Sequence, residues 1–503
     1  MAGLLAEPTG MRFLIILFLS ISLVQAQKPN VILIYVDDLG YGDLGSYGSK
    51  TIKTPHMDRL AKRGLRFTQA YSTSATCTPS RYSLLTGTYA VRRKDTGIAT
   101  GDASALILPG QQTIASIFSQ AGYQTAAIGK WHLGLGPQGG PNWNGKIAQG
   151  PLDIGFTEAF ILPATGDRVP CVYVENDHVL GLDATDPIQV SYTAKIGNMP
   201  TGKDNPELLK MKHSHGHDQS IVNGVGRIGF MQGGTSALWK DEDIAQRLTD
   251  RAKSFIGRNQ RKPFFLYFAT HDIHVPRLPH AKFLGKSGHG NRGDALLQLD
   301  DSVGQLMKTL DSLKLTQNTI VILTSDNGPV VDDGYVDQSK ELLGDHRPAA
   351  GLKGGKYSSF EAGTRVPFIV SWPTKIKQGT SHALLSQIDF VSSMAALVGK
   401  HVDHSQAKDS DNQLAAWIGQ SKEGRAYVIE QAGSLAIRQG DWKYISPSKG
   451  AAVNTFVNIE LGNNPADQLY DLANDSSEKI NLANQNPTKV QELKSLLLSI
   501  IQK

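Results

Sequence analysis

Short runs of β-branched and aromatic residues alternate along the chain with segments of helical periodicity. Because strands that alternate with helices form parallel sheets covered on both faces, the pattern predicts an α/β fold with a large central, mostly parallel sheet flanked by helices. The expected strands are Asn30–Val36, Tyr123–Ile128, Pro263–Ala269, Thr319–Thr324 and Val366–Val370. The expected helices are Thr54–Gly64, with Thr54 as cap and Pro55 in its first turn, Thr113–Ala121 and Ala295–Leu313.

The pattern changes at about residue 425. Three short strands are expected at Tyr427–Glu430, Leu435–Arg438 and Trp442–Ile445, followed by an amphipathic helix over Thr488–Ile501. This predicts a catalytic domain over 27–424 and a smaller C-terminal α+β subdomain, an antiparallel sheet plus helix, over 425–503. Residues 136–235 are rich in glycine and loops, and long loops on a rigid sheet often determine specificity.

The first 26 residues have the organisation of a secretory signal peptide. Arg12 precedes the apolar run Phe13–Val24, and Val24-Gln25-Ala26 offers a cleavage site with small residues. The run is too short for a transmembrane helix. We therefore expect a periplasmic or secreted protein without a membrane anchor.

Composition narrows the possible functions. Lys and Arg number 51 and Asp and Glu 46, a net charge of +5 over 503 residues, and no block of five basic residues occurs. A nucleic-acid partner is therefore not expected. The two cysteines, Cys77 and Cys171, exclude a disulfide-rich scaffold and a four-cysteine zinc site but leave one disulfide possible.

Acidic and amide residues follow two of the expected strands. Asp37 and Asp38 come directly after the first strand, and Asp326 and Asn327 come after Thr319–Thr324. An Asp-Asp pair alone would favour a turn or a helix cap. Because parallel strands end at the same edge of a sheet, the second pair favours a metal site. Oxygen ligands suit Ca²⁺ or Mg²⁺ and not zinc.

Two longer motifs resemble the signatures of a known family. The first is Cys77-Thr78-Pro79-Ser80-Arg81, followed by Leu84-Leu85-Thr86-Gly87. The second is Gly122-Tyr123-Gln124-Thr125 with Ile128-Gly129-Lys130-Trp131-His132. Together they resemble both signatures of the type I, formylglycine-dependent sulfatases, which are arylsulfatase-like members of the alkaline phosphatase superfamily. The resemblance extends from about residue 28 through Asp37-Asp38 and Asp326-Asn327 to Lys356 in GGKYSSFEAG.

The resemblance implies a modified nucleophile at Cys77. A maturation enzyme that reads Pro79 and Arg81 would oxidise Cys77 to Cα-formylglycine. One hydroxyl of the hydrated aldehyde would attack sulfur, and the other would lose its proton to release sulfate. The resemblance also implies Ca²⁺ in preference to Mg²⁺, bound by Asp37, Asp38, Asp326, Asn327 and residue 77.

Further catalytic roles follow from the same resemblance. Arg81, Lys130 and Lys356 would stabilise the charge of the sulfuryl group, with Lys353 as a competing candidate for the third position. His132 would act as the base that releases sulfate, and His274 as the acid that protonates the leaving alcohol.

Several polar residues are candidates for the substrate pocket: Asp167, Arg168, His215, His217, His271 and His346. The alternation of His213, His215 and His217 could instead bind a transition metal, although the glycine between them favours a loop. The segment 134–139 formally fits GxGxxG. Its proline and the lack of a following helix argue against a dinucleotide site.

The leading hypothesis is a secreted sulfatase that acts in exo mode on a sulfated carbohydrate. One alternative keeps the fold and changes the substrate to a phosphonate or phosphodiester. Another is a catalytically silent, sugar-binding homologue in which Cys77 is never oxidised. Zinc phosphatases of the superfamily carry Thr or Ser as nucleophile, so Cys77 argues against them.

Overall fold

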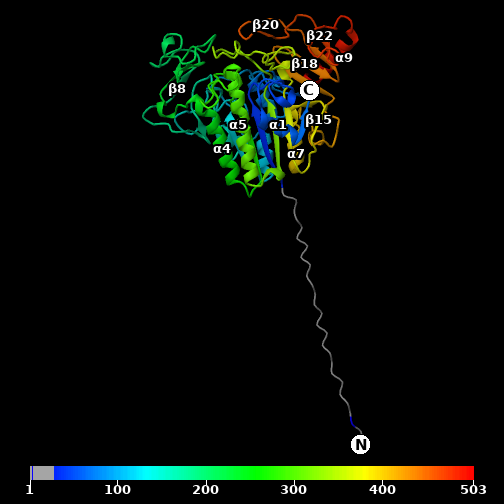
Figure 1. Cartoon of the computed structure of the whole chain (residues 1–503), viewed down its shortest axis with the longest axis horizontal. Helices are drawn as coiled ribbons and strands as arrows, with labels where there is room; N and C mark the ends of the chain where they lie inside the picture. The colour runs from blue at the N-terminus through cyan, green and yellow to red at the C-terminus, as the bar shows by residue number, and fades with distance from the viewer. Residues whose placement is uncertain (1–2, 4–27, 503) are drawn as a thin grey trace.

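A ten-stranded mixed sheet forms the centre of the protein (Figure 1). The computed structural model describes residue 3 and residues 28–502, so the expected signal peptide lies outside the described residues. No helix within these ranges is long and apolar enough to cross a membrane. The strands are, in spatial order, β15 (Gly379–Ser381), β2 (Gly64–Phe67), β14 (Phe368–Ser371), β13 (Thr319–Ser325), β1 (Asn30–Val36), β12 (Phe264–Ala269), β4 (Gln124–Lys130), β5 (Glu158–Leu162), β6 (Val174–Glu175) and β7 (His178–Val179).

The middle of this sheet is parallel. Strands β13, β1, β12, β4 and β5 are parallel neighbours, whereas β14 and β6 are antiparallel to β13 and β5. In β1 all seven residues are buried, because helices cover both faces. The predicted fold class, a mostly parallel sheet flanked by helices, is therefore confirmed.

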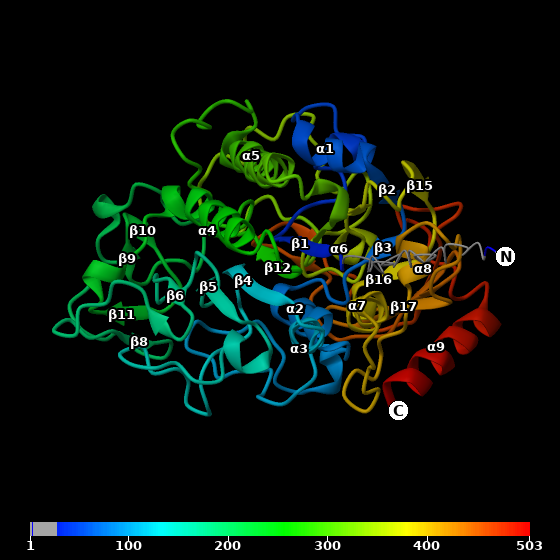
Figure 2. The ribbon, with the colours of Figure 1, turned by 90° about the horizontal axis from the view of Figure 1, so that it is seen from below.

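The side chains of β1 alternate between two helical layers. Val31, Leu33 and Tyr35 belong to one core, and Ile32 and Ile34 belong to the other. In Figure 2 the two layers lie on opposite sides of the sheet. The first layer contains α2 (Cys77–Thr86), α3 (Ile114–Gln120) and α7 (Phe390–Val398), and the second contains α1 (Pro55–Lys62), α4 (Ile244–Arg258) and α5 (Gly290–Ser312).

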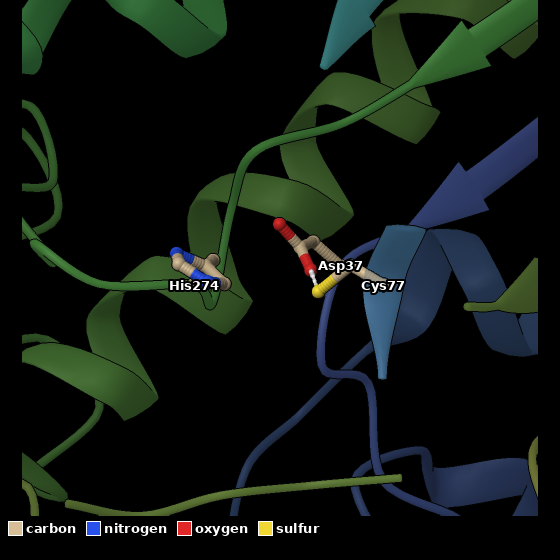
Figure 3. A group of neighbouring side chains, drawn as sticks. All are labelled: Asp37, Cys77 and His274. Atoms are coloured by element: carbon tan, nitrogen blue, oxygen red, sulfur yellow. Dashed lines mark hydrogen bonds between the residues drawn. The ribbon is translucent and has the colours of Figure 1, made fainter. Parts of the chain in front are cut away.

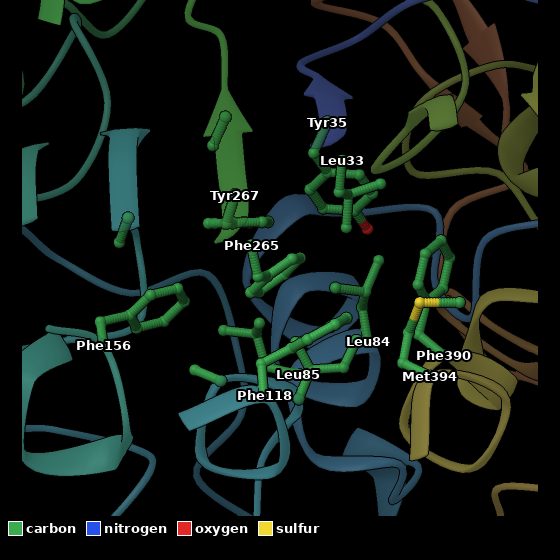
Figure 4. Close-up of a cluster of buried hydrophobic side chains, with 14 of the residues drawn as sticks. Leu33, Tyr35, Leu84, Leu85, Phe118, Phe156, Phe265, Tyr267, Phe390 and Met394 are labelled. Carbon is green, nitrogen blue, oxygen red and sulfur yellow. The ribbon is translucent and has the colours of Figure 1, made fainter. Parts of the chain in front are cut away.

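The core beneath α2 is closely packed with aromatic and aliphatic groups (Figure 4). Leu84 and Leu85 of α2 pack with Phe118, and the ring of Phe118 stacks on Phe265 at a centroid distance of 4.4 Å. All ten residues of α2 are buried. Such packing fixes the helix against the sheet, and with it Cys77 at the helix N-terminus.

A second, smaller sheet lies towards the C-terminus. Its four strands β17 (Tyr427–Gln431), β18 (Leu435–Gln439), β19 (Trp442–Ile445) and β22 (Gln468–Asp471) are antiparallel neighbours. Helix α9 (Pro487–Gln502) packs on it through Leu493 and Leu497. The exact domain boundary at residue 425 stays a prediction.

Several elements differ from the sequence expectation. Helices α2 and α4 and strand β22 were not expected. Thr54 is at the predicted cap position of α1, but its hydroxyl accepts from the Gly45 amide instead of capping the helix. Within 136–235 the chain forms only short elements, which include the antiparallel pairs β8 (Gln189–Ser191) with β11 (Phe230–Gln232) and β9 (Ile221–Val222) with β10 (Val225–Gly226).

A buried charge cluster joins the two sheets. The Lys443 ammonium lies 3.1 Å from Glu361, 3.0 Å from Glu430 and 3.6 Å from Glu478. Glu361 opens the short helix α6 (Glu361–Thr364) of the larger unit, and its backbone amide donates to Glu478. Burial raises the pKa of Glu478 to about 8, although Lys443 opposes this shift.

The raised pKa of Glu478 predicts that the free energy of unfolding decreases as pH rises. Between about pH 5 and pH 8 the folded protein keeps a proton on Glu478 that the unfolded chain has released, so the free energy of unfolding decreases as pH rises. Glu478→Gln cannot ionise, so its free energy of unfolding should fall by about 1 kcal/mol less than that of the wild type for each pH unit of this interval. Thermal melting at pH 6 and pH 8.5 measures the difference. Glu460→Gln, an exposed carboxylate, is the control, and equal slopes for all three proteins would contradict the prediction.

Candidate active site

The candidate site lies at the carboxyl ends of the parallel strands. Val36 at the end of β1 is in register with Ser325 at the end of β13, so Asp37 and Asp326 leave the sheet side by side. The Asp326 amide donates to the Val36 carbonyl at 3.0 Å. The predicted convergence of the two strand ends on one edge is observed.

Three carboxylates and one thiol lie close together at this edge. Ligand atoms of Asp37, Asp38, Cys77 and Asp326 all lie within 4.8 Å of one another, and all four residues are buried. Burial raises the pKa of Asp37 to about 7 against the opposing effect of Lys130, and Asp326 and Asp38 raise it further. A bound cation would reduce the repulsion between these buried carboxylates.

Asn327 adds an unpaired amide oxygen. Its Nδ2 donates to Asp38 Oδ1 at 2.7 Å and to the Gly328 carbonyl, whereas its buried Oδ1 has no hydrogen-bond partner among the residues that the structure describes. A buried acceptor without a donor is costly unless a bound ion or water satisfies it. The donor set therefore consists of hard oxygens and fits a divalent cation such as Ca²⁺ or Mg²⁺.

Each of the strand-end carboxylates has its own basic partner. Lys130 Nζ lies 2.5 Å from Asp37 Oδ2, and Lys356 Nζ lies 2.9 Å from Asp38 Oδ2. Arg81 donates through Nε and Nη2 to Asp326 Oδ2 at 2.9 and 2.7 Å. The three predicted cations are thus gathered around the acidic cluster.

Cys77 is the first residue of α2, with Thr76 as N-cap. Its Sγ lies 3.5 Å from Asp37 Oδ1, and Figure 3 shows the two side chains in contact, with His274 facing them. Burial raises the pKa of the Cys77 thiol well above its usual value, although Lys130 opposes the shift. Since the thiolate is the reactive form, the unmodified side chain is a poor nucleophile here.

Two of the predicted histidines keep a nitrogen available. His132 Nε2 is 3.0 Å from the Ala99 carbonyl while Nδ1 has no partner, and His274 Nδ1 is 2.6 Å from the Val275 carbonyl. Burial, together with nearby lysines, lowers the pKa of both rings well below the usual value. Each is therefore neutral at pH 7 and can accept a proton.

Asp167, Arg168 and His217 form one wall beside His274. Asp167 Oδ2 lies 3.0 Å from His217 Nε2, and Asp167 Oδ1 lies 2.9 Å from Arg168 Nη1. The negative charge of Asp167 acts on His274, and the positive charge of Arg168 acts on His132. His271 is nearby, 5.8 Å from the His274 ring, with both nitrogens unpaired and a pKa lowered by burial to about 4.

The other predicted pocket residues lie elsewhere. His346 is buried, and its two ring nitrogens contact Asp43 Oδ1 at 2.8 Å and Thr51 Oγ1 at 2.7 Å. Asp43 is also paired with Arg292. These partners, Asp43 and Thr51, belong neither to the acidic cluster nor to the wall beside His274, so we do not retain His346 in the site. His215 is half-buried at the rim, with its ring 6.3 Å from His217.

The alternating histidines do not form a metal site. Among the described residues, no group of three metal-binding side chains includes His213, His215 or His217. His213 instead pairs through its backbone with Tyr335. Cys77 and Cys171 are both free, so the possible disulfide is absent as well.

Two residues of the site were not predicted. Asp333 Oδ2 lies 2.9 Å from Lys356 Nζ, and its Oδ1 accepts from the Tyr357 hydroxyl at 3.1 Å. Burial alone would lower the pKa of the Lys356 ammonium, but Asp333 and Asp38 hold it well above its usual value. In the sequence, Asp333 stands in Asp-Asp-Gly, which is typical of a turn and carries no catalytic signal.

Comparison with known proteins identifies the family. The profile described as Sulfatase matches residues 29–400. The N-acetylgalactosamine-6-O-sulfatase of Bacteroides thetaiotaomicron is 54% identical over 477 residues, covering 94% of this chain and 93% of its own length. Human arylsulfatase A is 31% identical over 507 residues, with 96% and 90% covered.

A solved structure from work on glycosaminoglycan metabolism by Bacteroides thetaiotaomicron superimposes with a TM-score of 0.94 at 54% identity, covering 95% of this chain and 100% of its own. The chain therefore belongs to the sulfatase family, and the predicted resemblance is confirmed. It is an enzyme that hydrolyses sulfate esters.

The contacts of the two candidate lysines predict different effects on catalysis. Lys356 touches two carboxylates of the cluster, whereas Lys353 contacts Glu460 at 3.2 Å and lies 4.0 Å from the Phe360 ring centroid. Lys356→Ala should lower kcat by about a hundredfold or more, because an oriented cation in a dry site stabilises the transition state strongly. Lys353→Ala should stay within about threefold. Steady-state kinetics on an aryl sulfate test this, and similar effects of both substitutions would remove Lys356 from the site.

Proposed function

We propose that this sulfatase removes the 6-O-sulfate group from N-acetylgalactosamine units at the ends of sulfated carbohydrate chains. The observation that carries the proposal is the 54% identity, over nearly the full length of both chains, to a protein named N-acetylgalactosamine-6-O-sulfatase. At this identity the loops that surround the pocket, as well as the sheet, are expected to be shared.

The polar wall beside His274 supports recognition of a sugar. A buried sugar hydroxyl must be paired, and Asp167, Arg168 and His217 offer both acceptors and donors. None of the three contacts a strand-end carboxylate of the acidic cluster. We assign them to binding of the sugar ring and exclude them from the sulfur chemistry, with His271 as a further candidate.

We further propose that Asp37, Asp38, Asp326 and Asn327 hold a divalent cation, Ca²⁺ in preference to Mg²⁺. The unpaired Asn327 oxygen and the crowded carboxylates support this assignment. The ion would supply positive charge that neutralises sulfate oxygens. The protein residues keep the geometry, since Lys130, Lys356 and Arg81 each fix one carboxylate.

For Cys77 we propose conversion to formylglycine by a maturation enzyme. The buried, unreactive thiol at the start of α2 is consistent with a side chain that must be modified before it can act. The hydrated aldehyde would supply a nucleophilic hydroxyl. We also propose that the enzyme acts outside the cytoplasm, as the segment before residue 27 suggests.

We assign the two proton transfers to His132 and His274. His132 Nδ1, which is buried, unpaired and neutral, accepts the proton whose loss releases sulfate. His274 protonates the leaving alcohol, and this requires the ring to be charged. A bound sulfate anion adds negative charge beside His274 and thereby favours the protonated ring. Lys130 and Lys356 would bind the sulfuryl oxygens, and Arg81 would steady the hydrated aldehyde.

Substrate selectivity tests the proposed function. The wild type should hydrolyse galactosamine-6-sulfates at least about a hundredfold faster than the 4-sulfate isomers, because a hydroxyl-binding pocket rejects a misplaced group. His217→Gln should lower kcat/KM for the 6-sulfate about tenfold or more while an aryl sulfate stays within about threefold. Ion chromatography of released sulfate measures both.

His346→Gln is the matched control for this experiment. Because His346 is paired with Asp43 and Thr51, its substitution should lower the melting temperature and leave the ratio between the two substrates unchanged. A wild type that prefers another sulfated position would refute the proposed substrate. Equal losses on sugar and aryl sulfates in His217→Gln would show that His217 serves chemistry or folding.

The modification of Cys77 gives a separate prediction. In active enzyme the tryptic peptide that contains Cys77 should be lighter than the thiol form, because an aldehyde replaces the thiol. Mass spectrometry of the peptide, with and without a carbonyl-reactive hydrazide, measures the fraction converted. Cys171, buried and free, is the internal control and should remain a thiol. Full activity with an intact Cys77 thiol would contradict the prediction.

A further inference from the structure

An exposed aromatic side chain lies at the rim of the candidate site. Phe456 is 67% exposed, and no large hydrophobic side chain among the described residues is more exposed. It occupies the turn between β20 (Val453–Asn454) and β21 (Ile459–Glu460) of the C-terminal unit. In Figure 1 β20 lies at the upper edge of the molecule, between the C-terminal sheet and the side that carries β8.

The ring of Phe456 stacks on a residue of the pocket loop. Its centroid lies 4.9 Å from the His215 ring, with an interplanar angle of 25°. Two residues further on, His217 bonds to Asp167 in the proposed sugar pocket. One face of the Phe456 ring is thus supported by His215, and its exposure comes from the other face and the edge.

Side-chain hydrogen bonds also connect this region to the segments that form the site. The Ser358 hydroxyl donates to the Glu460 carbonyl at 2.6 Å, two residues from Lys356. Ser214 Oγ lies 3.3 Å from Asp332 Oδ1, next to Asp333, which holds Lys356. The aromatic platform is therefore built on the segments that form the catalytic pocket.

A groove of about 300 Å³ runs beside this platform. Its lining includes Phe456, Val457 and Ile459 from this hairpin, and Val331, Asp332 and Lys340 from the segment that follows β13. Lys340 is exposed and has no ion-pair partner in the part of the chain that the structure describes. The groove thus combines an aromatic face, a carboxylate acceptor and an unpaired cation.

We propose that Phe456, His215 and Lys340 form a subsite for the sugar next to the one that loses its sulfate. This inference rests on the proposed function, since it requires a carbohydrate substrate. The C–H face of a sugar ring is apolar and covers an aromatic ring, while its hydroxyls reach polar groups at the edge. Lys340 suits an anionic neighbour, such as a uronic acid or a second sulfated sugar.

The test compares a sulfated monosaccharide with a disaccharide that carries the same sulfated unit at its free end. Phe456→Ala should lower kcat/KM for the disaccharide about tenfold, mainly through KM, and leave the monosaccharide within about twofold. Phe456→Tyr should keep the wild-type ratio because it keeps the ring. Lys340→Gln should reduce the advantage of an anionic over a neutral neighbouring sugar.

Val453→Ala is the matched control, because Val453 is 39% exposed on the same hairpin and does not line the groove. It should change neither substrate. Equal losses on both substrates in Phe456→Ala would overturn the subsite and give Phe456 a role in the pocket itself. No loss on either would also overturn it and indicate a protein partner for this face.

Sulfate release by the wild type alone tests the proposed function, independently of the subsite. If the wild type releases sulfate from aryl esters and from neither sugar, both proposals are wrong. If it cleaves both sugars and Phe456→Ala leaves their ratio unchanged, only the subsite is wrong.

Discussion

Pairing of buried charges at one sheet edge is the constraint on which the site depends. Asp37, Asp38 and Asp326 are fully buried at the ends of two adjacent parallel strands, where like charges would repel. Each is paired with a basic group that comes from another part of the chain: the end of β4, the loop before α6, or α2. Burying a charge without a partner costs several kcal/mol, so the pairing also fixes how these segments sit relative to one another. Catalytic geometry and folding therefore rely on the same contacts.

This double role shapes how substitutions at the site must be interpreted. Removing Asp326 takes away a candidate ligand and also leaves the buried Arg81 guanidinium with hydrogen bonds to the Tyr267 hydroxyl and the Lys130 carbonyl but without its carboxylate. Part of any lost activity would then reflect lost stability. Lys356 contacts two carboxylates, Asp38 and Asp333, so its removal leaves both of them without this ammonium. Melting temperatures recorded beside kinetics separate the two effects.

The parts of the site that could be predicted from the sequence are those that directly follow a strand with a clear sequence pattern. Asn30–Val36 is rich in β-branched residues and forms a strand with those bounds, so Asp37 and Asp38 could be located from the pattern alone. The pocket loops have no periodicity, and their partners are distant in sequence: Asp167 meets His217, and Lys356 meets Asp333. His346 illustrates the failure, because a polar loop residue can equally pair with Asp43 inside the fold. Long-range pairing of isolated polar residues leaves no local signal.

The C-terminal sheet contacts the candidate site through its backbone. The Ala75 amide donates to the Gln431 carbonyl at 2.8 Å, and the Gln431 amide donates to Thr73. The Ala75 carbonyl in turn accepts from the Tyr357 amide, next to Lys356. The segment that enters α2 is thus held between β17 and the lysine loop, two residues before Cys77. Because the buried Lys443 cluster holds the same two units together, the C-terminal sheet helps to fix the position of Cys77.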